Sequence, residues 1–172
     1  MAHDSTIQNT PEAISRLREL VSKFHTAMFV TRGRDFPLHG RPMAVAQMEE
    51  DGTLWFVTGM DTPKINELTA NPDTLVCMQN GNQFVTVNGR IELVSDRRKL
   101  EELWRESFRV WFNGKDDPDI VLLRLSPSVG EYWDQSGIRG LKYAFRAAKA
   151  YIGNDRMDPR ADEPENHAQV KL

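Results

Sequence analysis

The sequence lacks the features that mark several large classes of proteins. Its 172 residues contain a single cysteine, Cys77, so no disulfide can form within the chain, which is typical of a reducing compartment. No apolar run approaches the roughly 20 residues that span a bilayer. The first residues have no basic segment followed by an apolar one, as a secretory signal would. These absences predict a cytoplasmic protein without a membrane partner.

Positive charge and catalytic motifs are also scarce. The 25 acidic side chains outnumber the 22 basic ones, so no global positive field attracts nucleic acid, and we expect no nucleic-acid partner. The four histidines are scattered without ligand spacing, which predicts no metal site. GxSxG, P-loop and GxGxxG motifs are missing, so nucleophilic hydrolysis and Rossmann-type dinucleotide binding have no support.

What the sequence does contain is a series of short segments with strand character, joined mainly by tight turns. Several are apolar on both faces and do not alternate regularly with helices, which predicts an antiparallel barrel with helices over its ends. The expected strands are Thr26–Gly33, Arg41–Met48, Thr53–Thr58, Thr74–Gln79, Gln83–Val94, Ile120–Leu125 and Ser128–Trp133, with a turn at Arg32, Arg34 and Asp35 that returns the chain to His39. The expected helices are one that Thr10-Pro11 opens, with Ile14, Leu17, Val21 and Phe24 along one face, then Pro63–Ala70, ended by Asn71-Pro72, and Arg97–Phe108. The Asn88-Gly89 pair predicts a bulge within the longest strand.

The stretch from His39 to Lys64 carries the clearest site prediction. Asp51-Gly52 favours a two-residue hairpin turn, and that register places Gln47 opposite Phe56 and Arg41 opposite Thr62. There Thr62-Pro63 begins a helix, with Thr62 as its cap.

A guanidinium, a hydroxyl, the Lys64 ammonium and the N–H groups of the helix start would then share one corner. Such a corner suits an anion, above all a phosphate. The alternative is that Arg41 and Lys64 are solvated or paired with Asp61 and Glu67, and that Thr62 only caps the helix.

Aromatic side chains provide a second candidate feature. The tryptophans and their neighbours could wall a slot for a flat heterocycle, although aromatic stripes at helical spacing are more often core. Trp111-Phe112 stands beside a polar loop rich in glycine and aspartate, where one chain buries large apolar groups poorly. An interface between two copies would bury them, which favours a homodimer.

The C-terminal part of the chain differs in character from the rest. Residues 136–152 could form a basic helix, for which a solvated face is the simplest interpretation. Residues 153–172 are polar and contain prolines, so we expect a loose tail or extended arm. The predicted organisation is therefore one folded domain, residues 10–135, followed by these two segments.

Together these motifs resemble the pyridoxamine-phosphate-oxidase-like flavin-binding split barrels, in their bacterial general stress protein branch. The likeness runs from about residue 12 to about residue 135. The segments that carry it are Arg41-Pro42-Met43, Gly52-x-Leu54-Trp55-Phe56-x-Thr58, Lys64, Val85–Gly89, Asp96, Leu103-Trp104, Trp111-Phe112, Asp116–Asp119 and Tyr132-Trp133-Asp134.

The resemblance implies a six-stranded antiparallel split β-barrel that dimerises, with FMN in two clefts at the interface and FAD as the alternative flavin. It implies that Arg41, Thr62 and Lys64 hold the phosphate. The strands carrying Arg41, Pro42 and Met43, and Trp55, Phe56, Val57 and Thr58, would line the flavin and ribityl chain. Trp111 and Phe112 of the other subunit would close over the ring.

One departure from the family bears on activity. True pyridoxamine-phosphate oxidases carry an arginine-containing substrate segment near the C-terminus, and residues 137–151 contain nothing like it, so pyridoxal phosphate synthesis is not expected. The leading hypothesis is an FMN-binding stress protein that acts as an oxidoreductase with a reduced nicotinamide. The rivals are a module that sequesters or senses flavin without turnover, and a family member without the cofactor. No side chain is an obvious acid or base beside the flavin.

Overall fold

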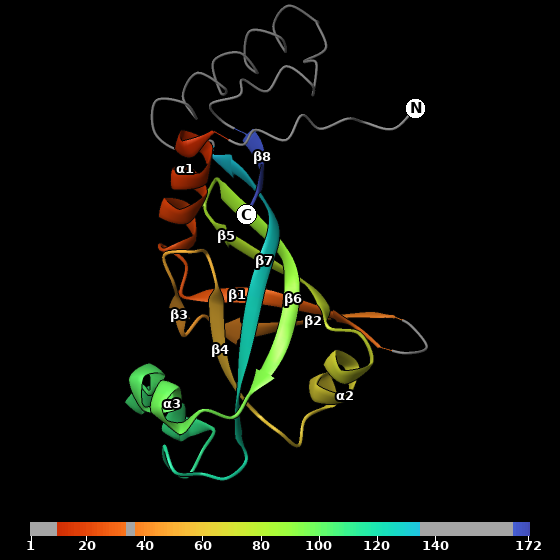
Figure 1. Ribbon diagram of the computed structural model, residues 1–172, viewed down its shortest axis with the longest axis vertical. Helices are drawn as coiled ribbons and strands as arrows, with labels where there is room; N and C mark the ends of the chain where they lie inside the picture. The colour runs from red at the N-terminus through yellow and green to blue at the C-terminus, as the bar shows by residue number, and fades with distance from the viewer. Residues whose placement is uncertain (1–9, 34–36, 135–166) are drawn as a thin grey trace, which may run out of the picture.

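The computed structural model describes residues 10–33, 37–134 and 167–172 (Figure 1). Its elements are α1 (Pro11–Val21), β1 (Thr26–Arg32), β2 (Leu38–Ala44), β3 (Gln47–Met48), β4 (Leu54–Gly59), α2 (Pro63–Ala70), β5 (Asp73–Asn80), β6 (Gln83–Val94), α3 (Arg97–Leu103), the 3₁₀ helix η1 (Glu106–Val110), β7 (Ile120–Asp134) and β8 (His167–Lys171). None of the helices in these ranges is long and apolar enough to cross a membrane.

The strands form one antiparallel sheet that curls on itself. Its order is β2-β1-β5-β6-β7-β4-β3, with β8 added on β7. The first and last strands of this order, β2 and β3, are joined by Val45 and Ala46 alone, a link that reaches roughly 11 Å at most. The two edges of the sheet must therefore meet, which confirms the predicted antiparallel split barrel, with more strands than the six that the resemblance implies.

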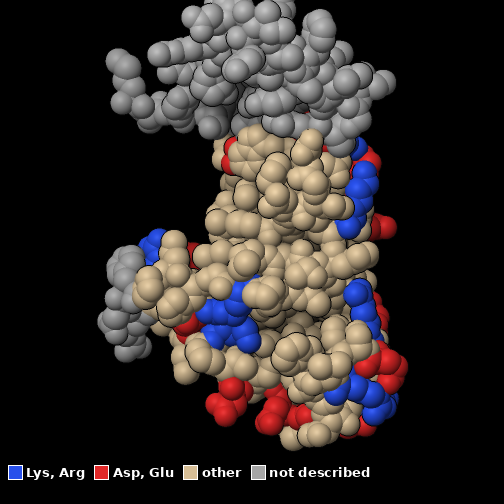
Figure 2. Space-filling view, turned by 180° about the vertical axis from the view of Figure 1, so that it is seen from behind, with Lys and Arg blue, Asp and Glu red and all other residues tan. Residues whose placement is uncertain are grey.

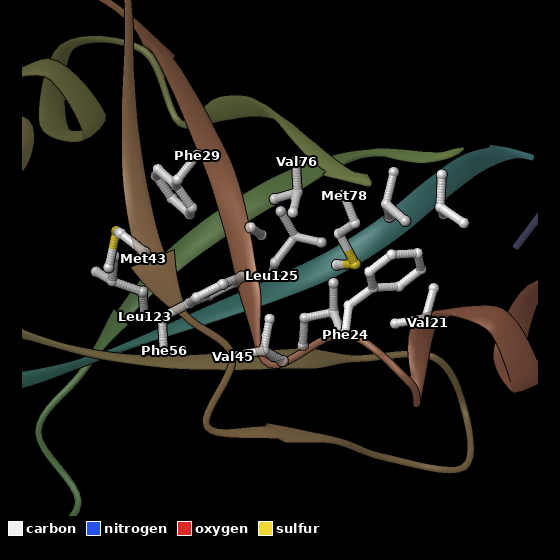
Figure 3. Packing of buried hydrophobic residues seen from close by; sticks show 14 of the residues in the cluster. Val21, Phe24, Phe29, Met43, Val45, Phe56, Val76, Met78, Leu123 and Leu125 are labelled. Atoms are coloured by element: carbon white, nitrogen blue, oxygen red, sulfur yellow. The ribbon is translucent and has the colours of Figure 1, made fainter. Parts of the chain in front are cut away.

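The inside of the barrel is filled by apolar side chains from nearly every strand (Figure 3). Phe29 of β1 and Phe56 of β4 are both fully buried and meet edge to face, with ring centroids 5.2 Å apart. Leu123 and Leu125 of β7 and Val76 of β5 are also fully buried. A second, smaller cluster joins α3 to the outer side of β4 and β7.

Helix α1 lies at one end of the barrel, whereas α2 and α3 lie toward the other (Figure 1). Thr10 caps α1 by accepting a hydrogen bond from the N–H of Ala13. The helix approaches β7 so closely that a Cβ on Gly130 would lie 2.2 Å from Leu17 Cδ2. The predicted helix start and its apolar face are thus confirmed.

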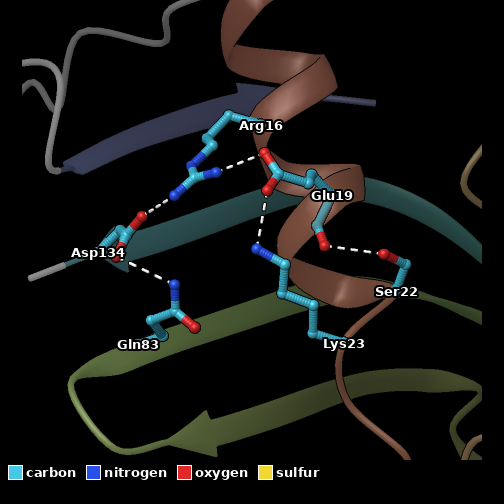
Figure 4. A network of polar contacts seen from close by, with 6 residues as sticks. All are labelled: Arg16, Glu19, Ser22, Lys23, Gln83 and Asp134. Atoms are coloured by element: carbon cyan, nitrogen blue, oxygen red, sulfur yellow. Dashed lines mark hydrogen bonds and ion pairs between the residues drawn. The ribbon is translucent and has the colours of Figure 1, made fainter. Parts of the chain in front are cut away.

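A polar network fixes α1 to the start of β6 and the end of β7 (Figure 4). Arg16 forms ion pairs with Glu19 and with Asp134, whose side chain is fully buried. Gln83 donates a hydrogen bond to the second oxygen of the Asp134 carboxylate at 3.1 Å. A buried carboxylate needs such partners because its desolvation is otherwise costly.

The bulge expected at Asn88-Gly89 is present, and it explains an unexpected proline. The register between β6 and β7 shifts there, and a Cβ on Gly89 would lie 2.4 Å from the Ser126 carbonyl oxygen. Two strands separated at Ser126-Pro127 were predicted, but β7 is continuous. On one edge of β7, pairing with β4 ends at Leu125 and pairing with β8 starts only at Val129. Pro127 lies between them, so neither of these strands needs the N–H that proline lacks.

The predicted central hairpin is wrong in register and in extent. The pairs are Gln47↔Trp55 and Met48↔Leu54, one residue away from the expected alignment. The turn is longer than two residues, because the Glu49 N–H bonds the Thr53 carbonyl at 2.9 Å. Only two pairs form between β3 and β4, and β2, which was expected to be part of the same strand, pairs with β1 instead.

Two further segments differ from expectation. The third helix ends at Leu103, and η1 follows it, where one helix up to Phe108 was expected. The end of the expected loose tail or arm forms β8, with Ala168 and Val170 buried against β7 and α1. The expected basic helix of residues 136–152 lies outside the described residues.

Candidate anion-binding site

Arg41 reaches the candidate site from β2, in the β1–β2 hairpin. Its backbone lies opposite Phe29, not opposite Thr62 as the predicted register required. The half-buried guanidinium donates from Nη1 to Thr31 Oγ1 at 2.8 Å and from Nη2 to Glu67 Oε2 at 2.7 Å. Two of its five N–H donors are thus used within the chain, and three remain.

The buried carboxylate of Glu67 on α2 anchors this arrangement. Thr31 Oγ1 donates to its Oε2 at 2.5 Å, and His39 Nδ1 lies 2.5 Å from its Oε1. Burial by itself raises the pKa of the Glu67 carboxyl, but the hydrogen bonds from Thr31, His39 and Arg41 outweigh it and lower the pKa to about 2. Glu67 is therefore ionised throughout the neutral range.

Lys64, in the first turn of α2, is a half-buried cation with hydroxyl partners. Its Nζ donates to Thr58 Oγ1 at 2.8 Å and to Thr62 Oγ1 at 3.2 Å, and it forms no ion pair with any described residue. Burial lowers the pKa of Lys64, the nearby Arg41 guanidinium lowers it further, and Glu67 raises it partly back. The two cations thus lie close enough to repel each other.

Thr62 holds the N-cap position of α2, but its hydroxyl does not cap the helix. The hydroxyl donates to the Gly59 carbonyl at 3.0 Å and accepts no hydrogen bond from the first-turn N–H groups of α2. The capping role expected for Thr62 is therefore wrong. The hydroxyl instead faces Lys64. The start of the helix therefore adds its dipole to the two cations without a side-chain cap to neutralise it.

These residues fit a phosphate group. Arg41 and Lys64 carry two positive charges against the single negative charge of Glu67, and both keep unused donors. An anion beside them would relieve their mutual repulsion and would raise the pKa of Lys64 back toward its ordinary range. The chemistry of the donor set thus agrees with the predicted phosphate corner, although the hairpin register from which it was predicted is wrong.

The alternative interpretation, in which Arg41 and Lys64 pair with acidic residues of the chain, holds for Arg41 but not for Lys64. Arg41 pairs with Glu67, as it proposed, but Lys64 pairs with neither carboxylate that it named. Lys and Arg side chains gather beside β2 and α2 on the face shown in Figure 2, and the central part of that face is uncharged.

The other residues expected along the flavin lie at different depths. Pro42 is exposed on β2, whereas Met43 beside it points into the barrel core. On β4, Phe56 is fully buried, and Thr58 is buried with its hydroxyl on Lys64. Met43 and Phe56 could therefore touch a ligand only through their backbone atoms.

Trp55 and Val57 belong to the smaller cluster beneath α3. Trp55 is 6 % exposed, and its ring packs under the Lys99 ammonium, which lies 5.2 Å from the ring centroid. Lys99 also donates to Glu49 at 2.9 Å, so it ties α3 to the turn after β3. The structure does not bring the side chain of Trp55 together with Arg41 and Lys64.

Trp111 and Phe112 follow η1 and differ in exposure. Trp111 is 80 % exposed. Phe112 is half-buried against the cluster beneath α3, and its Cε1 lies 3.8 Å from where a Cβ on Gly59 would be, beside Thr62. Phe112 therefore lies near the Lys64 corner of its own chain, whereas the Trp111 side chain is largely exposed.

Two clefts lie near the site without including its cations. One, of about 680 Å³, runs alongside β2 and is lined by Pro42, Met28, Cys77, Phe84 and Trp133, among others. The other, of about 580 Å³, is more polar and lies at the bulge, with Thr31 in its wall. No group of three or more metal-ligating side chains was found among the described residues.

A family model for proteins described as pyridoxamine 5'-phosphate oxidase like matches residues 12–158. The chain belongs to this family. Among curated proteins, general stress protein 26 of Bacillus subtilis (strain 168) is 29% identical over 80 residues, or 44% of this chain. The match spans 57% of the length of that relative.

Solved structures of family members have the same fold. General stress protein 26 from Bacillus anthracis str. Sterne superposes with a TM-score of 0.65 at 21% identity, covering 70% of this chain and 93% of the other. The general stress FMN/FAD binding protein from Xanthomonas citri superposes with a TM-score of 0.62 at 26% identity, covering 72% and 89%.

Sequence reasoning missed the role of Thr31 in this family member. Thr31 is 1 % exposed, faces His39 across the hairpin and lies diagonal to Arg41. The expected return of the chain at His39 was the available signal, because the register of a β1–β2 hairpin places Thr31 beside Arg41. Nothing local in the sequence connects Thr31 with Glu67, 36 positions away.

The low pKa of Glu67 predicts a specific loss of stability in acid. The carboxylate stabilises the folded state above its unfolded pKa near 4.5, and this contribution disappears as the pH falls toward about 2. The lowered pKa corresponds to a contribution on the order of 3 kcal/mol to the free energy of unfolding at neutral pH. Urea unfolding from pH 6 to pH 2.5 should therefore show a smaller difference between wild type and Glu67→Gln at the acid end. Glu92→Gln, which removes an exposed partner of Arg124, is the matched control and should give a nearly constant, small difference.

Proposed function

We propose that this protein binds FMN, with the flavin phosphate held by Arg41, Lys64, Thr62 and the first turn of α2. The observation that carries the proposal is the half-buried Lys64 ammonium, which has hydroxyl partners and a neighbouring guanidinium but no ion pair with any described residue. A phosphate dianion supplies the missing negative charge and accepts the unused donors.

The edge of β2 supports a place for the flavin ring. Within the described residues β2 pairs only with β1, so its other backbone edge is not hydrogen-bonded to a strand. The pyrimidine part of the isoalloxazine ring carries hydrogen-bond donors and acceptors that suit such an edge. Arg41, Pro42 and Met43 lie on it, next to the phosphate corner. Membership of the family, and a solved relative described as an FMN/FAD binding protein, agree with this proposal.

We extend the proposal to a homodimer with the flavin at the subunit interface. Large apolar side chains are exposed on strands near the site, among them Met28 (46 %), Leu38 (58 %) and Phe84 (39 %), and Trp111 at the end of η1 is also exposed. A second copy of the chain would bury them, as the hydrophobic cores of interfaces do. In this arrangement Trp111 and Phe112 of one subunit reach the ring bound by the other.

A bound flavin supplies hydride and electron transfer, and the chain's own part is to bind and orient it. We propose that a reduced nicotinamide is the electron donor, which makes the protein an FMN-dependent oxidoreductase of the stress-response type. The alternative is a module that binds or sequesters flavin without turnover.

The site is tested by replacing Arg41 and Lys64 with alanine. Each removes charge-assisted hydrogen bonds worth roughly 1.5–3 kcal/mol, so each single variant should bind FMN about 10- to 100-fold more weakly. Riboflavin, which lacks the phosphate, should bind the wild type and the variants with similar affinity. Flavin fluorescence titrations measure both. Lys115→Ala, which removes an exposed ion pair with Glu101, is the control. Unchanged FMN affinity in Arg41→Ala/Lys64→Ala would contradict the proposed phosphate position.

Turnover is tested separately, with the flavin-loaded protein. Anaerobic addition of NADPH or NADH should bleach the visible absorption of the bound flavin, and air should restore it. Stopped-flow absorbance gives the rate. If dithionite reduces the flavin and neither nicotinamide does, the protein is a binding module with respect to these donors and the oxidoreductase proposal fails.

The interface is tested with Trp111→Ala. Trp111 contributes little to its own chain, since it is 80 % exposed, so this change should leave the thermal unfolding of the subunit nearly unaltered while weakening the dimer. Sedimentation velocity over a range of concentrations should show an increase of tenfold or so in the dimer dissociation constant, typical of an aromatic interface residue. Bound flavin should become more fluorescent. Val110→Ala, its exposed neighbour, is a smaller truncation at the same place for comparison. The same sedimentation profile and flavin emission as wild type would exclude this role for Trp111.

A further inference from the structure

Glu67 is a surprising residue to find behind a site for an anion. Its carboxylate repels a phosphate, its side chain is 10 % exposed, and the corner would be more positive without it. A buried ionised group that opposes the expected ligand needs a compensating role. Its contacts suggest one, because they join its own helix α2 to two strands: Thr31 lies on β1, and His39 and Arg41 lie on β2.

We propose that Glu67 is a positioning residue that prepares the cation pair Arg41 and Lys64 for a phosphate monoester. It fixes the Arg41 guanidinium against the barrel, and its negative charge lets two cations remain side by side before the ligand is bound. This inference rests on the proposed function, since it concerns the same phosphate site.

The fixing of Arg41 follows from the hydrogen bonds. Nη2 bonds the Glu67 carboxylate and Nη1 bonds Thr31 Oγ1, which itself donates to Glu67. The guanidinium, the hydroxyl and the carboxylate are thus each bonded to the other two, and Thr31, which carries the hydroxyl, is 1 % exposed. A guanidinium held at two nitrogens keeps its plane, so its remaining donors have a set direction. Order supplied before binding reduces the entropy that the ligand must overcome.

The role of the charge follows from the surroundings of Lys64. The charged groups that act on it are Arg41 on β2, which disfavours its protonated form, and Glu67 on α2, which favours it. The groups that act on Glu67 are the charged Arg41 guanidinium and the hydrogen bonds of Thr31 and His39. Without the Glu67 carboxylate, burial and the Arg41 charge would still disfavour the protonated form of Lys64, and the negative charge that favours this form would be missing. Lys64 would then lose its proton at lower pH.

Two variants separate the two parts of the role. Glu67→Gln removes the charge and keeps an acceptor for Arg41, whereas Glu67→Ala removes both. Their electrostatic effect on the phosphate is the same, so a difference between them reports positioning. We expect Glu67→Ala to bind FMN about tenfold more weakly than Glu67→Gln at pH 7, as the loss of a hydrogen-bonded support implies, with riboflavin affinity equal in both. In an Arg41→Ala background the two should bind FMN alike.

The charge is tested by pH. The FMN dissociation constant at pH 10 divided by that at pH 7 should be at least about three times greater for Glu67→Gln than for the wild type. The reason is that Lys64 loses its proton at lower pH in the variant. A merely structural residue would lower affinity equally at both pH values. Glu92→Gln and Glu92→Ala, at an exposed carboxylate, are the matched controls, and circular dichroism checks the folding of each variant.

Failure of this inference is distinguishable from failure of the proposed function. Wild-type protein that binds neither FMN nor FAD overturns the proposed function. In that case NMR of the free protein still decides the inference, through the Lys64 ammonium titration and the Arg41 Nε–H order parameter. We expect a lower Lys64 midpoint in Glu67→Gln and a more mobile Arg41 in Glu67→Ala. Equal FMN binding by Glu67→Ala and Glu67→Gln, an unchanged alkaline ratio, or unaltered NMR signals overturn the inference.

Discussion

The two-residue link between β2 and β3 is the constraint on which the site depends. These strands lie at opposite ends of the hydrogen-bonded order of the sheet, yet only Val45 and Ala46 separate them. The sheet must curl until its edges meet, and the apolar faces turned inward become the core. Closure brings β2 within reach of the end of β4 and of α2, and so Arg41 comes close to Lys64.

Closure also explains why the cations lie at a half-open edge and not inside the barrel. The interior is filled by side chains such as Phe29, Phe56 and Leu123, which leave no room for a ligand. Polar groups collect where the strands end and α2 begins. There the Glu67 carboxylate and the Arg41 guanidinium share Thr31 as a partner, and the Lys64 ammonium is bonded to two threonine hydroxyls. The net positive charge of these three groups is what we propose an anion from outside to compensate. The same edge has exposed apolar side chains, which fits a site completed by a second subunit.

Several local predictions agree with the structure because their causes are local. Proline and a capping threonine begin α1, Asn71-Pro72 ends α2, and Asn88-Gly89 marks the bulge. The hairpin around Gly52 was predicted less well. Gly52 does have a positive φ of 90°, but the turn begins at Glu49, and one extra residue shifts every pair in the ladder. Arg41 and Lys64 were thus predicted together through a pairing that does not exist.

The sequence by itself determined the alternation of short strands and helices, the residue types of an anion corner, and the family. The first two depend on side-chain preferences within single segments, and the family depends on the combined spacing of motifs between about residue 12 and about residue 135. Only the tertiary structure decided that Trp55 lies beneath α3 and that Thr31 and Glu67 surround Arg41. These contacts join segments far apart in the chain, and their geometry follows from the curling of the whole sheet.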